Sequence, residues 1–124
     1  MLEAPATALS DAEQVLEAGQ SPKLRCVVCA RAITTLDEAT RVAGAHRHEF
    51  ANPAGQRFRI GCYANAPGAA ASGAPSDYWS WFDGCHWRIA ECRGCAVQLG
   101  WQFCNSSGQR FFAPIVDALV ESAS

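Results

Sequence analysis

The chain has 124 residues, a length that suits one domain with one modest core. Ten Lys and Arg stand against 12 Asp and Glu, for a formal net charge of −2, which argues against a nucleic-acid backbone or an anionic membrane as partner. No apolar run approaches the roughly 20 residues that a membrane helix needs. The first cation is Lys23 and no apolar stretch precedes it, so a secretory signal is not indicated and we expect a cytoplasmic protein.

The chain contains seven cysteines, a high and odd count for its length. An odd number without a secretory signal argues against a disulfide scaffold and for reduced thiols. Metal binding is therefore the first explanation for the clustered cysteines.

The first 22 residues are expected to form a peripheral segment, and residues 23–124 the domain. Ser10 and Glu13 make a capping-box pattern, and Gly19 would end a short helix over Asp11–Ala18. A tail without regular structure is the alternative for this segment.

From Lys23 to Ala113 the residue pattern is typical of β-strands. Strands are expected at Lys23–Val28, Ala32–Thr35, His46–Ala51, Gln56–Tyr63, Trp79–Phe82, Trp87–Glu91, Gln98–Cys104 and Gln109–Ala113. Turn signals separate these runs every 8–12 residues, which predicts an all-β domain of antiparallel hairpins.

Three connections carry their own signals. In Asn52-Pro53-Ala54-Gly55, Pro at the second position and Gly at the fourth suit a tight hairpin turn. Asn65–Ser76 is rich in Gly, Pro, Ala and Ser and is expected to be a loop. Pro114 is expected to start a final short helix over Ile115–Ser122.

Two Cys-x-x-Cys pairs, Cys26 with Cys29 and Cys92 with Cys95, are separated by 62 residues. Each pair suits a tight knuckle after a strand, and four thiolates complete the tetrahedral shell of one Zn²⁺ with no open position for water. We therefore expect one structural zinc ion that pins the domain. The alternative is redox chemistry at one pair, but no βαβ pattern surrounds either.

All four tryptophans lie within Trp79–Trp101. Trp101 and Phe103 are two apart on an expected strand and face one side, while Trp81 and Trp87 bracket a turn at Gly84. The spacing fits a tryptophan-rich core, and it fits a three-walled cage for a cation or a flat, compact ligand. Four clustered tryptophans exceed the usual need of a small core, which favours the cage, but both interpretations stay open.

Several motifs resemble, in order and spacing, the thalidomide-binding (CULT) domain of cereblon. They are Cys26-Val-Val-Cys29, Asn52-Pro53, Ser80-Trp81-Phe82-x-Gly84-x2-Trp87, Cys92-x2-Cys95 and Gly100-Trp101-x-Phe103. The resemblance covers roughly Leu24 to Leu119 and is closest to the stand-alone bacterial cereblon-domain proteins. It implies a β-tent of two antiparallel sheets, joined by the Cys₄ zinc site.

The resemblance also implies a non-enzymatic ligand-binding pocket. Its walls would be Trp81, Trp87 and Trp101, and its base Phe103. Such pockets hold glutarimide and related cyclic imides, thalidomide-type drugs, C-terminal cyclic imides of peptides and, in bacterial relatives, uridine. The backbone C=O of Trp79 and N–H of Trp81 would bind the imide edge.

The remaining expected pocket residues are Asn52 and Pro53 at the rim, Phe58 nearby, and Ser80 within the motif. This chain has Trp79 and Phe58 where animal relatives usually have His, and Cys85 where Tyr is usual. Ubiquitin-ligase partners are not expected, because the domains that bring them are lacking.

Two other functions compete with the binding module. Methionine-R-sulfoxide reductases share the β-tent, but their nucleophilic Cys follows a Gly-x-Arg-Tyr segment. Here Gly108-Gln109-Arg110-Phe111 is followed by Phe112, and only Cys104 lies near. A zinc-ribbon-like interaction protein is the third possibility, and the acidic balance argues against its nucleic-acid version.

Overall fold

The computed structural model describes residues 21–122, so the helix expected at 11–18 lies outside it. Its strands are β1 (Lys23–Cys26), β2 (Ala32–Thr35), β3 (Arg47–Ala51), β4 (Arg57–Gly61), β5 (Ala69–Ser76), β6 (Cys85–Cys92), β7 (Gln98–Asn105), β8 (Arg110–Pro114) and β9 (Leu119–Ser122). Only two 3₁₀ turns, Leu36–Glu38 and Val116–Ala118, are helical within the described residues. The predicted all-β class is confirmed. Within residues 21–122, no helix has the length and apolar character needed to cross a bilayer.

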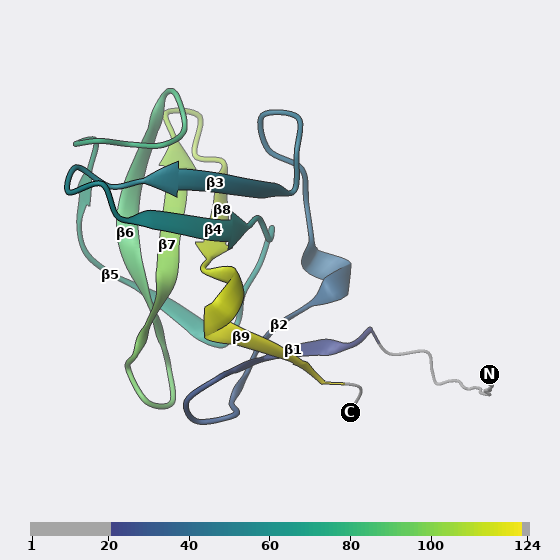
Figure 1. Ribbon diagram of the computed structural model, residues 1–124. Coiled ribbons are helices and arrows are strands. Elements are labelled where there is room, and N and C mark those ends of the chain that lie inside the picture. Colours follow the sequence, from purple (N-terminus) through teal and green to yellow (C-terminus); the bar gives the residue numbers. More distant parts are fainter. Residues whose placement is uncertain (1–20, 123–124) are drawn as a thin grey trace.

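All strand pairs are antiparallel, and they form three hydrogen-bonded groups (Figure 1). The largest sheet has the order β5-β6-β7-β8, the second has the order β2-β1-β9, and β3 pairs with β4 alone. Isolated bridges, Ile60 with Ile115 and Tyr63 with Phe112, join the β3–β4 side to the β8 side. The strands therefore divide among three sheets rather than the two expected, because within residues 21–122 isolated bridges, and no continuous strand pairing, join the β3–β4 hairpin to the β8 side.

Three local predictions were wrong. Ala69–Ser76 is strand β5 and not a loop, because its backbone pairs with β6 from Ala69↔Cys92 onward, a bonding that needs no large side chain. Trp79–Phe82 is a series of turns rather than a strand. The helix expected at Ile115–Ser122 is one 3₁₀ turn followed by β9, which pairs with β1.

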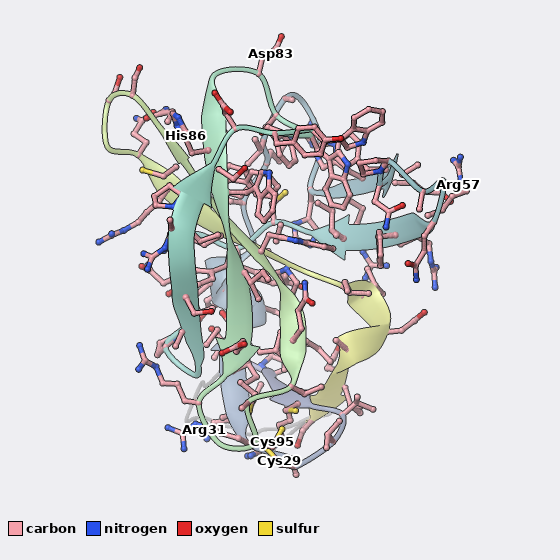
Figure 2. The ribbon with its side chains drawn as sticks, turned by 90° about the vertical axis from the view of Figure 1, so that its left-hand side faces the viewer. Cys29, Arg31, Arg57, Asp83, His86 and Cys95 are labelled. Atoms are coloured by element: carbon pink, nitrogen blue, oxygen red, sulfur yellow. The ribbon has the colours of Figure 1, made fainter. Side chains whose placement is uncertain are left out.

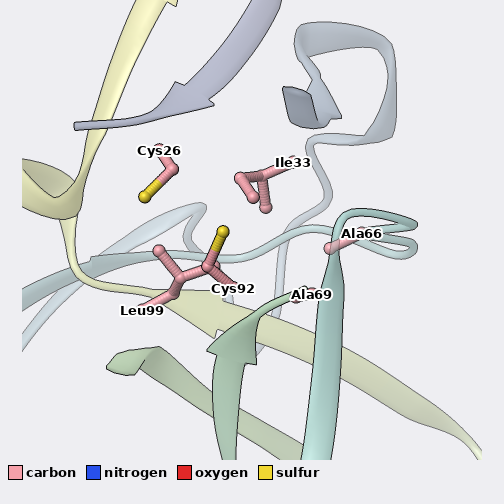
Figure 3. Close-up of a cluster of buried hydrophobic side chains, with 6 residues drawn as sticks. All are labelled: Cys26, Ile33, Ala66, Ala69, Cys92 and Leu99. Atoms are coloured by element: carbon pink, nitrogen blue, oxygen red, sulfur yellow. The ribbon is translucent and has the colours of Figure 1, made fainter. Parts of the chain in front are cut away.

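Two clusters of buried side chains form the core. The first lies beside the cysteine pairs and contains Cys26, Ile33, Ala66, Ala69, Cys92 and Leu99 (Figure 3). The second contains Ile60, Cys62, Phe82, Phe103 and Ala113, with Trp81, Trp87 and Trp101 packed against it. The first cluster thus lies next to the predicted metal-binding cysteines, and the second lies next to the tryptophans.

Gly68 brings β2 against the large sheet. Its N–H donates to Ile33 O at 2.9 Å, and its own carbonyl accepts from Arg93 N at 2.9 Å. A Cβ atom at Gly68 would lie 2.1 Å from Ala32 O, so only glycine permits this approach. The contact fastens the sheet that carries the first cysteine pair to the strand that carries the second.

Candidate functional site: a four-cysteine cluster and an aromatic cavity

The four predicted cysteines converge at one end of the molecule. The sulfur atoms of Cys26, Cys29, Cys92 and Cys95 all lie within 4.8 Å of one another. The Sγ–Sγ distances are 3.7 Å from Cys26 to Cys95 and 3.5 Å from Cys29 to Cys92. Sulfurs at about 2.3 Å from a tetrahedral ion would be about 3.8 Å apart, so the four can hold one metal ion.

Each knuckle has the same backbone design. Cys26 N donates to Arg31 O at 2.8 Å, and Cys92 N donates to Val97 O at 2.9 Å. Gly94 adds an N–H that reaches Cys92 Sγ at 3.3 Å. A Cβ atom at Gly94 would lie 3.2 Å from Cys29 Sγ, so glycine also keeps room for the neighbouring sulfur. Backbone bonds therefore close both knuckles, and in the second one an N–H also donates to a cysteine sulfur.

The four sulfurs perturb one another. Burial raises the pKa of Cys92, but the N–H groups of Cys95 and Gly94 and the neighbouring thiols outweigh it and bring that pKa to about 7. For Cys95, the N–H of Val97 lowers the pKa, whereas burial and the other cysteines raise it to about 11. Four thiols this close cannot all ionise unaided, and a bound divalent cation removes that conflict.

A cavity of about 280 Å³ is lined in part by Tyr78, Trp79 and Trp81 of the loop between β5 and β6. Figure 2 shows Asp83, in the loop between β5 and β6, at the far end from Cys29 and Cys95. The cavity is lined by Asn52, Pro53, Tyr78, Trp79, Trp81, Trp87, Trp101 and Phe103. None of these side chains is charged, so the lining suits an uncharged, largely apolar ligand.

Four indoles contribute to the lining of this cavity. Trp81 and Trp101 meet edge to face, with ring centroids 4.7 Å apart and planes at 74°. Trp87 lies opposite Phe103 in the β6–β7 register, so both project from one face of the sheet. Phe103 is 1% exposed and is the one fully buried residue of the lining. Flat rings on several sides of an open volume can hold a flat ligand between them.

Hydrogen bonds fix three of the four indoles. The Nε1 atoms of Trp79 and Trp81 both donate to Ala51 O, at 2.8 and 2.9 Å. The Nε1 of Trp87 donates to Tyr78 O at 2.7 Å. In the described part of the chain, the Trp101 indole N–H has no hydrogen-bond partner. Three indoles are therefore held by backbone carbonyls, two of them by the end of β3 and one by the β5–β6 loop.

Two backbone groups of the lining are left without partners. Among residues 21–122, no protein group bonds to the carbonyl of Trp79 or to the N–H of Trp81. The two groups are two residues apart in one loop, and they offer one acceptor and one donor. Unpaired backbone groups beside an apolar cavity are the means by which a ligand can be oriented.

No family model matches the chain. Its sequence is similar to proteins named cereblon: 35% identical over 75 residues in Gallus gallus and 37% over 54 residues in Danio rerio, or 57% and 44% of this chain. A relative of the same name in Drosophila melanogaster is 50% identical over 32 residues. These matches support a cereblon-like domain. They cover only 17%, 12% and 6% of the respective relatives, so this chain corresponds to a small part of those proteins.

The expected pocket residues fall into two groups in the structure. Trp79, Trp81, Trp87, Trp101 and Phe103 line one cavity together with Asn52 and Pro53. The other two do not line it. Phe58 packs behind the wall, 5.3 Å from Trp101 between ring centroids, and the Ser80 hydroxyl donates to Phe82 O at 3.1 Å.

Two roles at the rim differ from those expected. Asn52 Oδ1 accepts from Ala54 N at 3.0 Å and Gln56 N at 2.9 Å, so this oxygen organises the turn. Tyr78, which was not among the expected pocket residues, lines the cavity and is 64% exposed. Its place directly before Trp79 in an aromatic run was the only signal in the sequence.

Proposed function

We propose that this chain is a non-enzymatic binding module for small cyclic imides. The ligand class includes glutarimide, thalidomide-type compounds, C-terminal cyclic imides on peptides, and uridine-like molecules with the same imide edge. A ubiquitin-ligase role is not part of the proposal. We also propose that the chain resembles the stand-alone bacterial cereblon-domain proteins more than the animal proteins.

The observation that carries the proposal is the pairing of an apolar aromatic cavity with two unpartnered backbone groups. A cyclic imide is flat and uncharged, and it carries one N–H donor between two carbonyl acceptors. The Trp79 carbonyl and the Trp81 N–H match that edge as acceptor and donor, and the rings of Trp81, Trp87 and Trp101 match its faces. The volume of about 280 Å³ suits one small ring with room for a substituent at the rim.

We further propose that the metal at the cysteine cluster is one structural Zn²⁺. An all-thiolate tetrahedral site favours zinc among common divalent ions. Cys26, Cys29, Cys92 and Cys95 would hold it, with no coordination position left for a substrate. Its role would be to join β1 to β6, since each of these strands ends at one of the buried cysteines.

We propose no catalytic activity for the same chain. The segment that resembles the reductase motif continues with Phe112, which carries no nucleophile. Cys104 lies opposite His86 in the β6–β7 register, and its side chain alternates with that of Phe103. The thiol therefore projects from the face of the sheet that turns away from the cavity. Turnover of a methionine-R-sulfoxide that disappears in Cys104→Ser would contradict this part of the proposal.

The direct test is calorimetric and fluorescence titration with glutarimide, uridine and a peptide ending in a cyclic imide. We expect micromolar affinity, because small buried ligands reach at most about 1.5 kcal/mol per heavy atom and most reach less. N-methylglutarimide is the matched control, since it keeps the ring and removes the donor. The N-methyl compound should bind more weakly, because it leaves the Trp79 carbonyl unpaired. No binding of any imide would refute the function, and equal binding of both glutarimides would refute the orientation.

A further inference from the structure

The side chain of Trp79 connects the two halves of the cavity wall. Trp79 belongs to the loop between β5 and β6, whereas Ala51 ends β3 and is followed by Asn52 and Pro53 at the rim. The Nε1–H of Trp79 donates to Ala51 O at 2.8 Å across this division. Trp81 donates to the same oxygen at 2.9 Å, and both bonds therefore fasten the loop to the hairpin.

The backbone of Trp79 has a conformation that a bulky residue rarely adopts. Its φ is 56°, in the left-handed region. Ser80 N lies 3.4 Å from Asp77 O, which makes Trp79 the third residue of a turn. Positive φ at that place is normally taken by glycine. Such strain persists only where the surrounding structure holds it, and here the indole bond to Ala51 supplies the hold.

The strained residue carries one of the two unpartnered backbone groups of the cavity. The direction of the Trp79 carbonyl depends on the backbone dihedrals of this residue, so whatever holds φ also aims the acceptor. The side chain is 54% exposed and still lines the cavity, so a role in the core does not account for it.

From these contacts we propose that Trp79 is a positioning residue for ligand selectivity. Its indole bond to Ala51 holds its own carbonyl ready to accept the ligand's N–H, and holds the β3–β4 hairpin at the cavity before ligand arrives. The inference rests on the proposed function, because it concerns the acceptor of the same imide. Its consequence is specific: Trp79 should govern the discrimination between an imide and its N-methyl derivative more than it governs affinity for the ring.

Two substitutions of Trp79 separate positioning from packing. Trp79→Phe keeps an aromatic ring and removes the N–H. Trp79→Gly removes the side chain and accepts the positive φ without strain. Asp83→Asn is the matched control, because it changes an exposed side chain of the same loop that does not line this cavity, and it leaves the bond to Ala51 intact. Trp81 keeps its own bond to Ala51 in all three variants, so the hairpin should remain folded.

The decisive measurement is the ratio of the dissociation constants of N-methylglutarimide and glutarimide, taken by calorimetry. We expect this ratio to fall at least about threefold in Trp79→Phe and in Trp79→Gly, and to stay at the wild-type value in Asp83→Asn. Loss of apolar contact with the ring weakens the binding of both ligands by the same factor, so it cancels in the ratio of their dissociation constants. An unchanged ratio in both Trp79 variants would overturn the inference.

The bond from Trp79 Nε1 to Ala51 O, which we call the tether, can also be tested without ligand. Hydrogen exchange measures how firmly it holds the β3–β4 hairpin. Amides of residues 47–61 should exchange faster in Trp79→Phe than in Asp83→Asn, and equal exchange would overturn the role of the Trp79–Ala51 bond in holding the hairpin. If the wild-type protein binds no imide, the proposed function fails and the aiming of the carbonyl fails with it. The tether is then decided by the exchange data alone.

Discussion

Ala30 and Ala96 hold the same position in the two metal knuckles, with φ angles of 67° and 66°. Each donates its N–H to the carbonyl of the first cysteine of its pair, at 2.8 Å for Ala30 and 2.9 Å for Ala96. The two knuckles are therefore one local structure built twice, from segments far apart in the chain. Both place an alanine where the backbone favours glycine.

We expect Ala30→Gly and Ala96→Gly to stabilise the protein. A left-handed residue with a Cβ costs about 1–2 kcal/mol, and the extra entropy that glycine loses on folding offsets about 0.5–1 kcal/mol of the relief. The free energy of unfolding in urea should therefore rise by up to about 1 kcal/mol for each variant. Ala71→Gly in strand β5 is the control and should lower it. A loss in the knuckle variants equal to that in the control would contradict this account.

The cysteine cluster predicts one zinc ion per chain. Cys26→Ser and Cys95→Ser should each lose the metal and the β-structure, because three thiolates cannot close the site, and structural zinc contributes roughly 10 kcal/mol or more. Metal analysis and far-ultraviolet circular dichroism measure the two effects. Cys104→Ser removes a thiol outside the cluster and should keep both zinc and fold. Folded protein without zinc, or a fold indifferent to a chelator, would be incompatible with this prediction.

Trp87→Ala distinguishes a cavity wall from a core residue. If Trp87 is a wall, glutarimide affinity should fall at least about tenfold, or roughly 1.4 kcal/mol, while the protein stays folded. A core tryptophan would instead cost about 3–5 kcal/mol of stability. Calorimetry and thermal unfolding separate these outcomes. Trp87→Phe, which keeps a ring at this place, should recover part of the affinity.

Gly68→Ala should be among the most destabilising single changes in the chain. The new methyl group would lie 2.1 Å from Ala32 O and 2.6 Å from Ile33 Cα, both backbone atoms that cannot move without disturbing β2. We expect a loss of more than about 3 kcal/mol, measured by urea unfolding. Gly61→Ala is the control: its nearest contacts are side chains at 3.2 Å, so it should cost less. Similar losses in both variants would show that the approach at Gly68 is not special.

Cys62 should make the protein less stable at alkaline pH. Burial raises the pKa of this thiol from 9.0 to about 11. Between these two pKa values the unfolded thiol ionises and the folded thiol does not. The contribution of Cys62 to the free energy of unfolding is therefore complete below about pH 9 and is lost as pH rises towards 11. Cys62→Ala should reduce the fall of the unfolding free energy over that range. Identical slopes in wild type and Cys62→Ala would rule out this origin.

The sequence by itself predicted the all-β class, the turn at Asn52–Gly55 and the four cysteines that converge. These features rest on local chemistry: Pro and Gly set turn dihedrals over a few residues, and cysteine spacing sets knuckle geometry. The aromatic run from Trp79 to Trp101 also contained most of the residues that line the cavity.

Only the tertiary structure decided which backbone segments pair and what each aromatic does. Ala69–Ser76 is a strand because β6 lies beside it, and β9 is a strand because β1 does; neither segment has side chains that demand it. The sequence likewise could not distinguish Phe58, which lies behind the wall, from Tyr78, which lines it. The physical reason is the same in each case: backbone hydrogen bonds and side-chain burial depend on neighbours distant in the chain, which local propensity does not specify.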